Sequence, residues 1–181
     1  MRAKWIGAGT VALVAAAALT AACGEGRAIF DVDVYSFLKS GADTVHYTIP
    51  IVGTASDSNP PIKVGLLGGF GKSVVDTVTI TGGANIVNTT GSGSVTFRLF
   101  IAADSAGTYS GTPVLTAGGA VNGPGTTAIG GVATLIGDSL FNNQTLWFGV
   151  QARVTATTPP VTGKVQVTAL RLRVVMKPKL F

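Results

Sequence analysis

Few residues of this chain have the chemistry that catalysis requires. The 181 residues include one histidine, His46, and one cysteine, Cys23. A Ser-His-Asp site would have to use His46, but this histidine lies between Val45 and Tyr47 in an alternating run. The chain also contains no Gly-X-Ser-X-Gly sequence of the kind that presents a nucleophilic serine. We therefore expect His46 to be an exposed surface residue and the protein not to be an enzyme.

The acidic residues suggest one candidate metal site. Asp31 and Asp33 are two positions apart, so in a strand both side chains lie on the same face. With a loop oxygen from Asp57 or Asp104 they could form half of a calcium site, since calcium prefers oxygen ligands. The alternative is that they mark the solvent face of the first strand. One histidine and one cysteine exclude poly-histidine and multi-cysteine metal sites, so we expect no cofactor.

The basic residues are concentrated at the end of the chain. The formal net charge is +5, and no acidic residue follows Asp138. Such one-sided charge can bind anionic lipid headgroups or the acidic face of a protein, or it can be a solvated face whose lysines discourage edge-to-edge aggregation. Nucleic acid is not expected, because no recognition motif is present. The candidate interaction residues are Arg153, Arg171, Arg173, Lys177 and Lys179.

Trp147 is a further candidate interaction residue. It falls on the polar side of an alternating run, so the sequence predicts that its ring points outward. Tyr109 and Phe141 lie in or near predicted loops. These three aromatic residues could form a platform on which a sugar stacks, or an anchor at a protein interface. The alternative is that they belong to a second layer of the core.

The first 22 residues are typical of a secretory signal. Arg2 and Lys4 precede an uncharged stretch from Trp5 to Ala22, and small residues follow before Cys23. The sequence Leu19-Thr20-Ala21-Ala22-Cys23 resembles the lipobox of bacterial lipoproteins. It departs from the usual pattern in having Thr20, and not leucine, three positions before the cysteine. The resemblance implies cleavage before Cys23 and a lipid anchor on its thiol.

Two other outcomes remain open for this segment. Ordinary cleavage near Ala22 would release a soluble secreted protein. Retention of the apolar stretch would give a short membrane-spanning helix, since about 17–25 residues suffice. All three outcomes place the following domain outside the cytoplasm, on the periplasmic side or at the outer membrane of a bacterium. Gly24, where a simple inner-membrane retention signal would have aspartate, favours the outer membrane.

The remainder of the chain reads as a β-rich domain. Only 12% of the residues are charged, and the 25 glycines and 8 prolines are spread among short runs of alternating apolar and polar residues. The pattern predicts strands at 28–38, 45–51, 62–68, 73–81, 95–101, 111–117, 127–136, 146–156 and 164–177. In the last of these the apolar phase changes near Ala169–Leu170, which predicts a bulge or a strand that passes between sheets.

These strands predict an all-β fold, an antiparallel β-sandwich of the jelly-roll or immunoglobulin-like kind. The expected organisation is a signal peptide or N-terminal membrane-anchor helix at 1–22, a short tether at 23–27 and one domain at 28–181. We expect a structural or interaction protein that is tethered to the extracytoplasmic face of a membrane, as a scaffold or accessory subunit of an envelope complex with a protein partner. The alternative is a module that binds carbohydrate or another small ligand, assisted by calcium.

Overall fold

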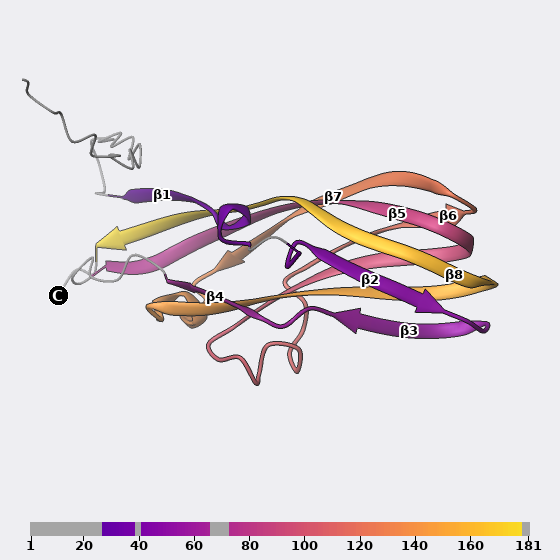
Figure 1. The fold of residues 1–181 in the computed structure, drawn as a ribbon. Coiled ribbons are helices and arrows are strands. Elements are labelled where there is room, and N and C mark those ends of the chain that lie inside the picture. The colour runs from indigo at the N-terminus through magenta and orange to yellow at the C-terminus, as the bar shows by residue number, and fades with distance from the viewer. Residues whose placement is uncertain (1–26, 39–40, 66–72, 179–181) are drawn as a thin grey trace, which may run out of the picture.

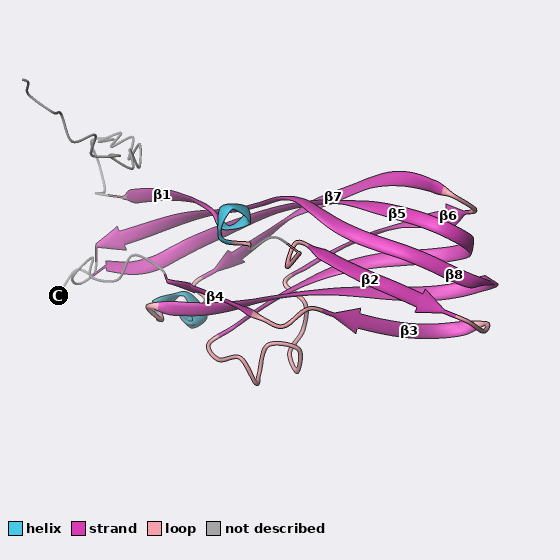
Figure 2. Cartoon of the chain, viewed as in Figure 1, coloured by secondary structure: helices cyan, strands magenta, loops and turns pink. Residues whose placement is uncertain are grey.

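The computed structural model describes residues 27–38, 41–65 and 73–178. The predicted signal or anchor helix, Cys23 and Lys179 lie outside the described residues. The described chain is built from antiparallel strands and two short 3₁₀ helices, so the predicted all-β sandwich is confirmed (Figures 1 and 2). No helix among the residues described is long and apolar enough to cross a membrane.

Two very long strands run through the whole domain. β5 (Ser73–Ala102) and β8 (Thr145–Pro178) are antiparallel partners from Ser73 opposite Pro178 to Ala102 opposite Trp147. The register shifts repeatedly between Asn88 and Gly93, where both strands bend back together. One continuous hydrogen-bonded sheet is thereby folded over on itself, and each half of the pair forms the centre of one layer (Figure 1).

The shorter strands flank this central pair. We call layer I the sheet of β1 and β2, residues 161–178 of β8, residues 73–88 of β5, and β7, in that order. Layer II contains β3 and β4, residues 145–156 of β8, residues 92–102 of β5, and β6. This order of strands is that of a jelly roll, in which neighbours along the chain fold over into opposite sheets. The bounds are β1 Ala28–Asp33, β2 Thr44–Ile49, β3 Gly53–Ser58, β4 Ile62–Gly65, β6 Leu115–Asn122 and β7 Gly125–Ile136, with 3₁₀ helices η1 Val34–Phe37 and η2 Ser139–Asn142.

The core lies between the two layers. In layer II the alternating residues from Leu146 to Ala156 point inward and are buried, as the period of two predicts. In layer I the inward side chains of β5 and β8 meet them. The largest fully buried side chains are Phe97, Phe148, Ile80, Ile86, Leu99, Leu146, Leu170 and Leu172, together with Phe100, which is buried on the outer face of layer II.

The predicted bulge in the last strand is confirmed. Gly83 lies opposite Ala169 and Ala84 lies opposite Val167, so Thr168 is the extra residue that shifts the apolar phase. The sequence predicted separate strands at 73–81 and 95–101. This prediction was wrong, because β5 continues through Gly82 and Gly83 and includes both segments. The strand β3 has no counterpart among the predicted strands.

Candidate interaction surfaces

The outer face of layer I carries matched opposite charges. Asp31 lies directly opposite Arg173, and Asp33 lies directly opposite Arg171. Residues directly opposite each other in an antiparallel pair have Cβ atoms about 5 Å apart, so these charges neutralise one another locally. Farther along β8, the Lys177 ammonium forms an ion pair of 2.9 Å with Asp76. This face is therefore charged but not predominantly basic.

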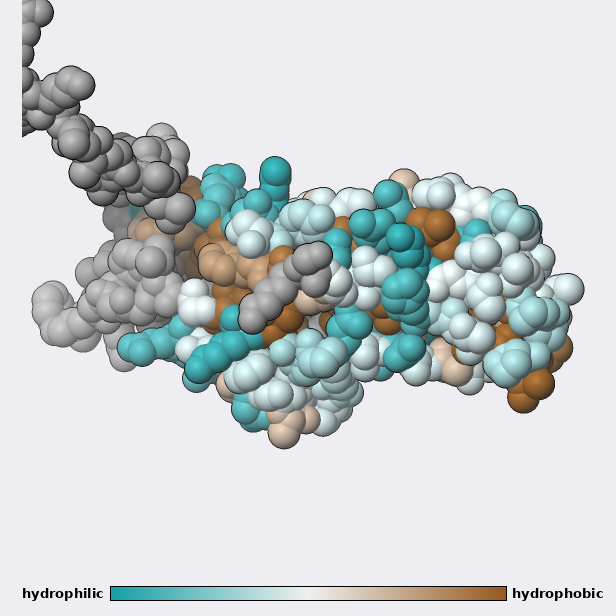
Figure 3. Space-filling model, viewed as in Figure 1, coloured by the Kyte–Doolittle hydropathy of each residue, from teal (hydrophilic) through white to brown (hydrophobic). Residues whose placement is uncertain are grey.

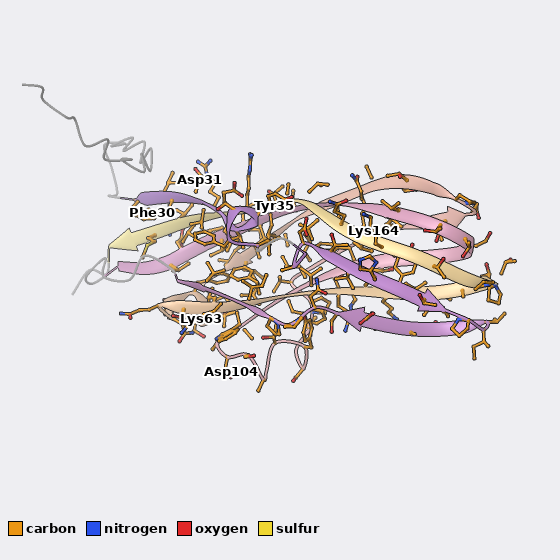
Figure 4. The ribbon with its side chains drawn as sticks, viewed as in Figure 1. Phe30, Asp31, Tyr35, Lys63, Asp104 and Lys164 are labelled. Atoms are coloured by element: carbon orange, nitrogen blue, oxygen red, sulfur yellow. The ribbon has the colours of Figure 1, made fainter. Side chains whose placement is uncertain are left out.

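The two candidate calcium ligands lie within this charged arrangement. Figure 4 shows Asp31 on the outer side of β1, far from Asp104, which lies in the loop below layer II. Asp57 belongs to β3, also in layer II. Among the residues that the structure describes, no group of three or more histidine, cysteine, aspartate or glutamate side chains could hold a metal ion.

Arg153 and Trp147 lie on the opposite side of the molecule, on the outer face of layer II. Arg153 pairs across the sheet with Ser56 and Thr96, and Trp147 pairs with Lys63 and Ala102. The structure thus divides the predicted basic set between two faces. Trp147 is half-buried and Arg153 is exposed.

A guanidinium with fixed contacts lies on the same face, near Arg153. Arg98 donates a 3.0 Å hydrogen bond from Nη1 to Oε1 of Gln151, its cross-strand neighbour. The same guanidinium lies over the ring of Phe100, 5.2 Å from its centroid, a cation–π arrangement. The sequence pattern did not single out Arg98, because its role depends on which strand lies next to β5.

Tyr109 belongs to a small second core outside layer II. The loop after β5 folds back over the sheet, and the Tyr109 hydroxyl donates hydrogen bonds to the carbonyls of Asn59 and Val150. Its ring meets Phe100 edge-on, with centroids 5.4 Å apart, and lies on Gly149. Burial raises the pKa of this phenol above its usual range. Tyr109 is therefore engaged within the protein, and Phe141 is buried in the main core.

His46 lies in β2 opposite Lys164 and is exposed to solvent, as predicted. A different polar residue, Asn88, is buried at the bend of β5. Its amide donates to the carbonyls of Thr90, Gly91 and Gly123, and its oxygen accepts from the Tyr47 hydroxyl. Asn88 therefore ties the bend of β5 to the β6–β7 turn and to β2, and it has a structural role.

The bends and turns that join the layers gather at one end of the molecule, which we call the distal tip. It consists of residues 50–52, 89–91, 123–124 and 157–160, the last including a cis peptide bond between Pro159 and Pro160. The tip contains no charged residue. Ile51 and Val52 are 71% and 68% exposed, and Figure 3 shows apolar atoms at this end of the molecule.

Hydrogen bonds join three of the four tip segments, namely 89–91, 123–124 and 157–160. The Thr90 hydroxyl lies 2.9 Å from the Pro160 carbonyl, and the Gly123 amide donates to the Gly91 carbonyl at 2.9 Å. The opposite end of the molecule holds both the beginning of β1 and the end of β8, since Ala28 pairs with Met176. The distal tip and the beginning of β1 are therefore separated by the length of the sandwich (Figure 1).

Comparisons with known proteins find only remote structural neighbours. No protein-family model matches the chain, and no curated protein is significantly similar in sequence. The structure of the infectious bursal disease virus Gx strain is similar over 87% of this chain and 38% of that chain, with 8% identity and a TM-score of 0.40. A structure described as "CBM4 structure and function" covers 84% of this chain and 87% of its own, with 12% identity and a TM-score of 0.28. The chain spans about two fifths of the length of the viral chain.

Proposed function

We propose that this protein is a non-catalytic interaction protein, anchored at the extracytoplasmic face of a bacterial membrane through Cys23, that binds a protein of the cell envelope with its distal tip. The observation that supports this proposal is the pair of exposed aliphatic side chains, Ile51 and Val52, on an uncharged end of the sandwich. Exposed apolar clusters on an otherwise polar surface mark interaction sites.

The chemistry of the tip favours a protein over a lipid surface. Segments that enter the lipid–water interface use tryptophan, tyrosine, lysine and arginine beside their aliphatic residues. The tip segments contain threonine, glycine and proline around Ile51 and Val52, and none of those four residue types. Depletion of charge around a central apolar contact is characteristic of the core of protein interfaces. The tip also lies at the end of the molecule away from β1, so it would extend from the membrane toward the partner.

The experiment is to purify the full chain from bacterial membranes, measure its intact mass and identify the proteins that co-purify. We expect a chain that begins at Cys23 with added acyl chains, and a partner that is lost from the Ile51→Asp, Val52→Asp double variant. Phe37→Asp is the matched control, because Phe37 is also an exposed large apolar residue, 51% exposed, but lies away from the tip. An unmodified chain that retains Met1 would refute the lipid anchor, and unchanged co-purification with the double variant would refute the tip as the binding site.

A second candidate function is binding of a carbohydrate on the outer face of layer II. The supporting observation is that Arg98, held by Gln151, lies near Arg153 on this face, while the half-buried Trp147 lies farther along the same face, beyond Phe100 and Tyr109. Planar guanidinium donors suit sugar hydroxyls, and an indole ring suits a sugar ring face. Screening the full chain against glycans tests this function, and binding that survives the Arg98→Ala, Trp147→Ala double variant would refute this face as the site.

A further inference from the structure

The edge of layer I formed by β7 has the properties of a strand that pairs with another strand. β7 is 12 residues long and pairs with β5 without a single register shift, from Thr77 opposite Ile136 to Asn88 opposite Gly125. Within the described part of the chain, no strand pairs with its other side. The backbone N–H and C=O groups on the side of β7 away from β5 therefore form a long, regular row that is available for hydrogen bonding.

This edge lacks the devices by which proteins protect free strands. Natural edges are shortened or carry lysine, other charges, proline or a bulge. β7 contains none of these, and the chain has no aspartate, glutamate, lysine, arginine or histidine from Ser105 to Gly137. Other edge strands of the sandwich carry charges or are shorter: β1 carries Asp31 and Asp33, β3 carries Asp57 and β4 carries Lys63, while β2 and β6 have 6 and 8 residues.

The side chains of β7 are incompletely buried on both faces. Val132 and Ile136 point outward and are 64% and 79% exposed. Ile129, Ala133 and Leu135 point toward the core and pack against it while remaining partly accessible. A strand added beside β7 would cover apolar atoms on both faces and would extend the core past the present edge.

We propose that β7 pairs with β7 of a second copy of this chain, in an antiparallel dimer that joins the two layer I sheets. A two-fold axis perpendicular to the sheet makes identical surfaces meet. It also places outward residues opposite outward residues. Self-pairing of β7 brings together only neutral residues, whereas self-pairing of β1 would bring Asp31 and Asp33 close to their own copies. The charge pattern therefore excludes β1, and among the edge strands without aspartate, glutamate, lysine or arginine β7 is the longest, with 12 residues against 8 in β6 and 6 in β2. This inference does not depend on the lipid anchor or on the distal tip.

The test compares the full chain in detergent with charged variants at the edge. We expect the wild-type chain to be a dimer by sedimentation or light scattering, and the Val132→Lys, Thr134→Lys double variant to be a monomer. Both side chains are exposed, so the variant should retain its melting temperature apart from the loss of the dimer. The matched control is Thr81→Lys, because Thr81 is exposed on the same face and lies directly opposite Val132, one strand inward. The control should remain dimeric.

Hydrogen exchange identifies the surface that is involved. In the dimer, the β7 amides that point away from β5 should exchange slowly. In the double variant these same amides, which are every second one along the strand, should exchange rapidly. A monomeric wild-type chain would overturn the proposal, even if that monomer binds an unrelated protein through β7. It would also be overturned by a double variant that stays dimeric, or by a dimer whose β7 amides exchange as fast as those of the variant.

Discussion

The buried polar residues of this protein serve to hold its bends. Asn88 is 4% exposed, yet its side chain makes four hydrogen bonds, two to the nearby Thr90 and Gly91 and two to Tyr47 and Gly123, which are far away in the sequence. A buried polar group is tolerated when its hydrogen bonds are satisfied, and it then fixes the positions of its partners. A single side chain therefore sets how β5 approaches β2 and the connection between β6 and β7.

Replacing Asn88 by alanine should destabilise the domain by about 3 kcal/mol, because the carbonyls and the Tyr47 hydroxyl that it contacts would lose their partner. The control is Asn85→Ala on the same strand, which is half-buried and should change stability by less than about 1 kcal/mol. Denaturant unfolding of both variants provides the measurement. Equal losses would contradict the role of Asn88.

Tyr47 gives the domain a sensitivity to alkaline pH. Burial raises the pKa of this phenol from 10.0 to about 12. The unfolded chain therefore loses the proton at a lower pH than the folded chain. The stability is fully present below pH 10 and falls as the pH rises toward 12.

In the Tyr47→Phe variant this alkaline loss should be smaller. At neutral pH the variant should be about 1 kcal/mol less stable, since Asn88 loses a hydrogen bond. Unfolding measured at a series of pH values checks both effects. If the two proteins lose stability in parallel above pH 10, the titration of Tyr47 is not the cause.

Among the elements, the loop between β5 and β6 depends on one glycine of β8. A Cβ at Gly149 would come within 2.8 Å of three atoms of Thr108 and Tyr109. The strand therefore has room for the Tyr109 ring only because it lacks a side chain at this position. This explains why the ring can pack edge-on against Phe100 and close the second core.

The Gly149→Ala variant should displace the loop and cost about 1–3 kcal/mol, as overpacking does. Gly111→Ala in the same loop is the control, because a Cβ there meets nothing within 4 Å. Thermal unfolding and protease sensitivity of residues 103–114 report the change. A stable Gly149→Ala variant with an intact loop would contradict this account of the packing.

The alternating runs predicted most of the strand positions, and the phase change near Ala169 predicted the bulge. They did not predict β3, because Gly53–Ser58 has little apolar alternation and is held by its pairing with β8. They also divided β5, since its middle is rich in glycine, asparagine and serine, which are common in turns. Continuity through these residues depends on pairing with β8, which is far away in the sequence.

On the scale of the whole molecule, the sequence shows which residues have the chemistry for an interaction, but it did not predict which of them share a surface. Arg153 and Arg171 were grouped by their positive charge, and the bend of β8 places them on opposite outer faces. The distal tip and the β7 edge both lack charged residues. At the tip, the uncharged segments are separate in the sequence and form one surface only when the chain is folded. A sandwich folded from one sheet therefore creates surfaces that no single segment encodes.

The shared central pair also imposes an order on how the chain folds. Ala102 meets Trp147 across a much shorter stretch of chain than Ser73 and Pro178 enclose at the other end of the same ladder. Closing the shorter loop costs less conformational entropy, so pairing should begin in layer II and proceed around the bend into layer I. The strands β6 and β7 meet β5 across still shorter stretches of chain, from Leu99 opposite Leu115 and from Asn88 opposite Gly125. They should therefore pair with β5 before β8 does, and the edge of β7 would be available while the monomer is still incomplete.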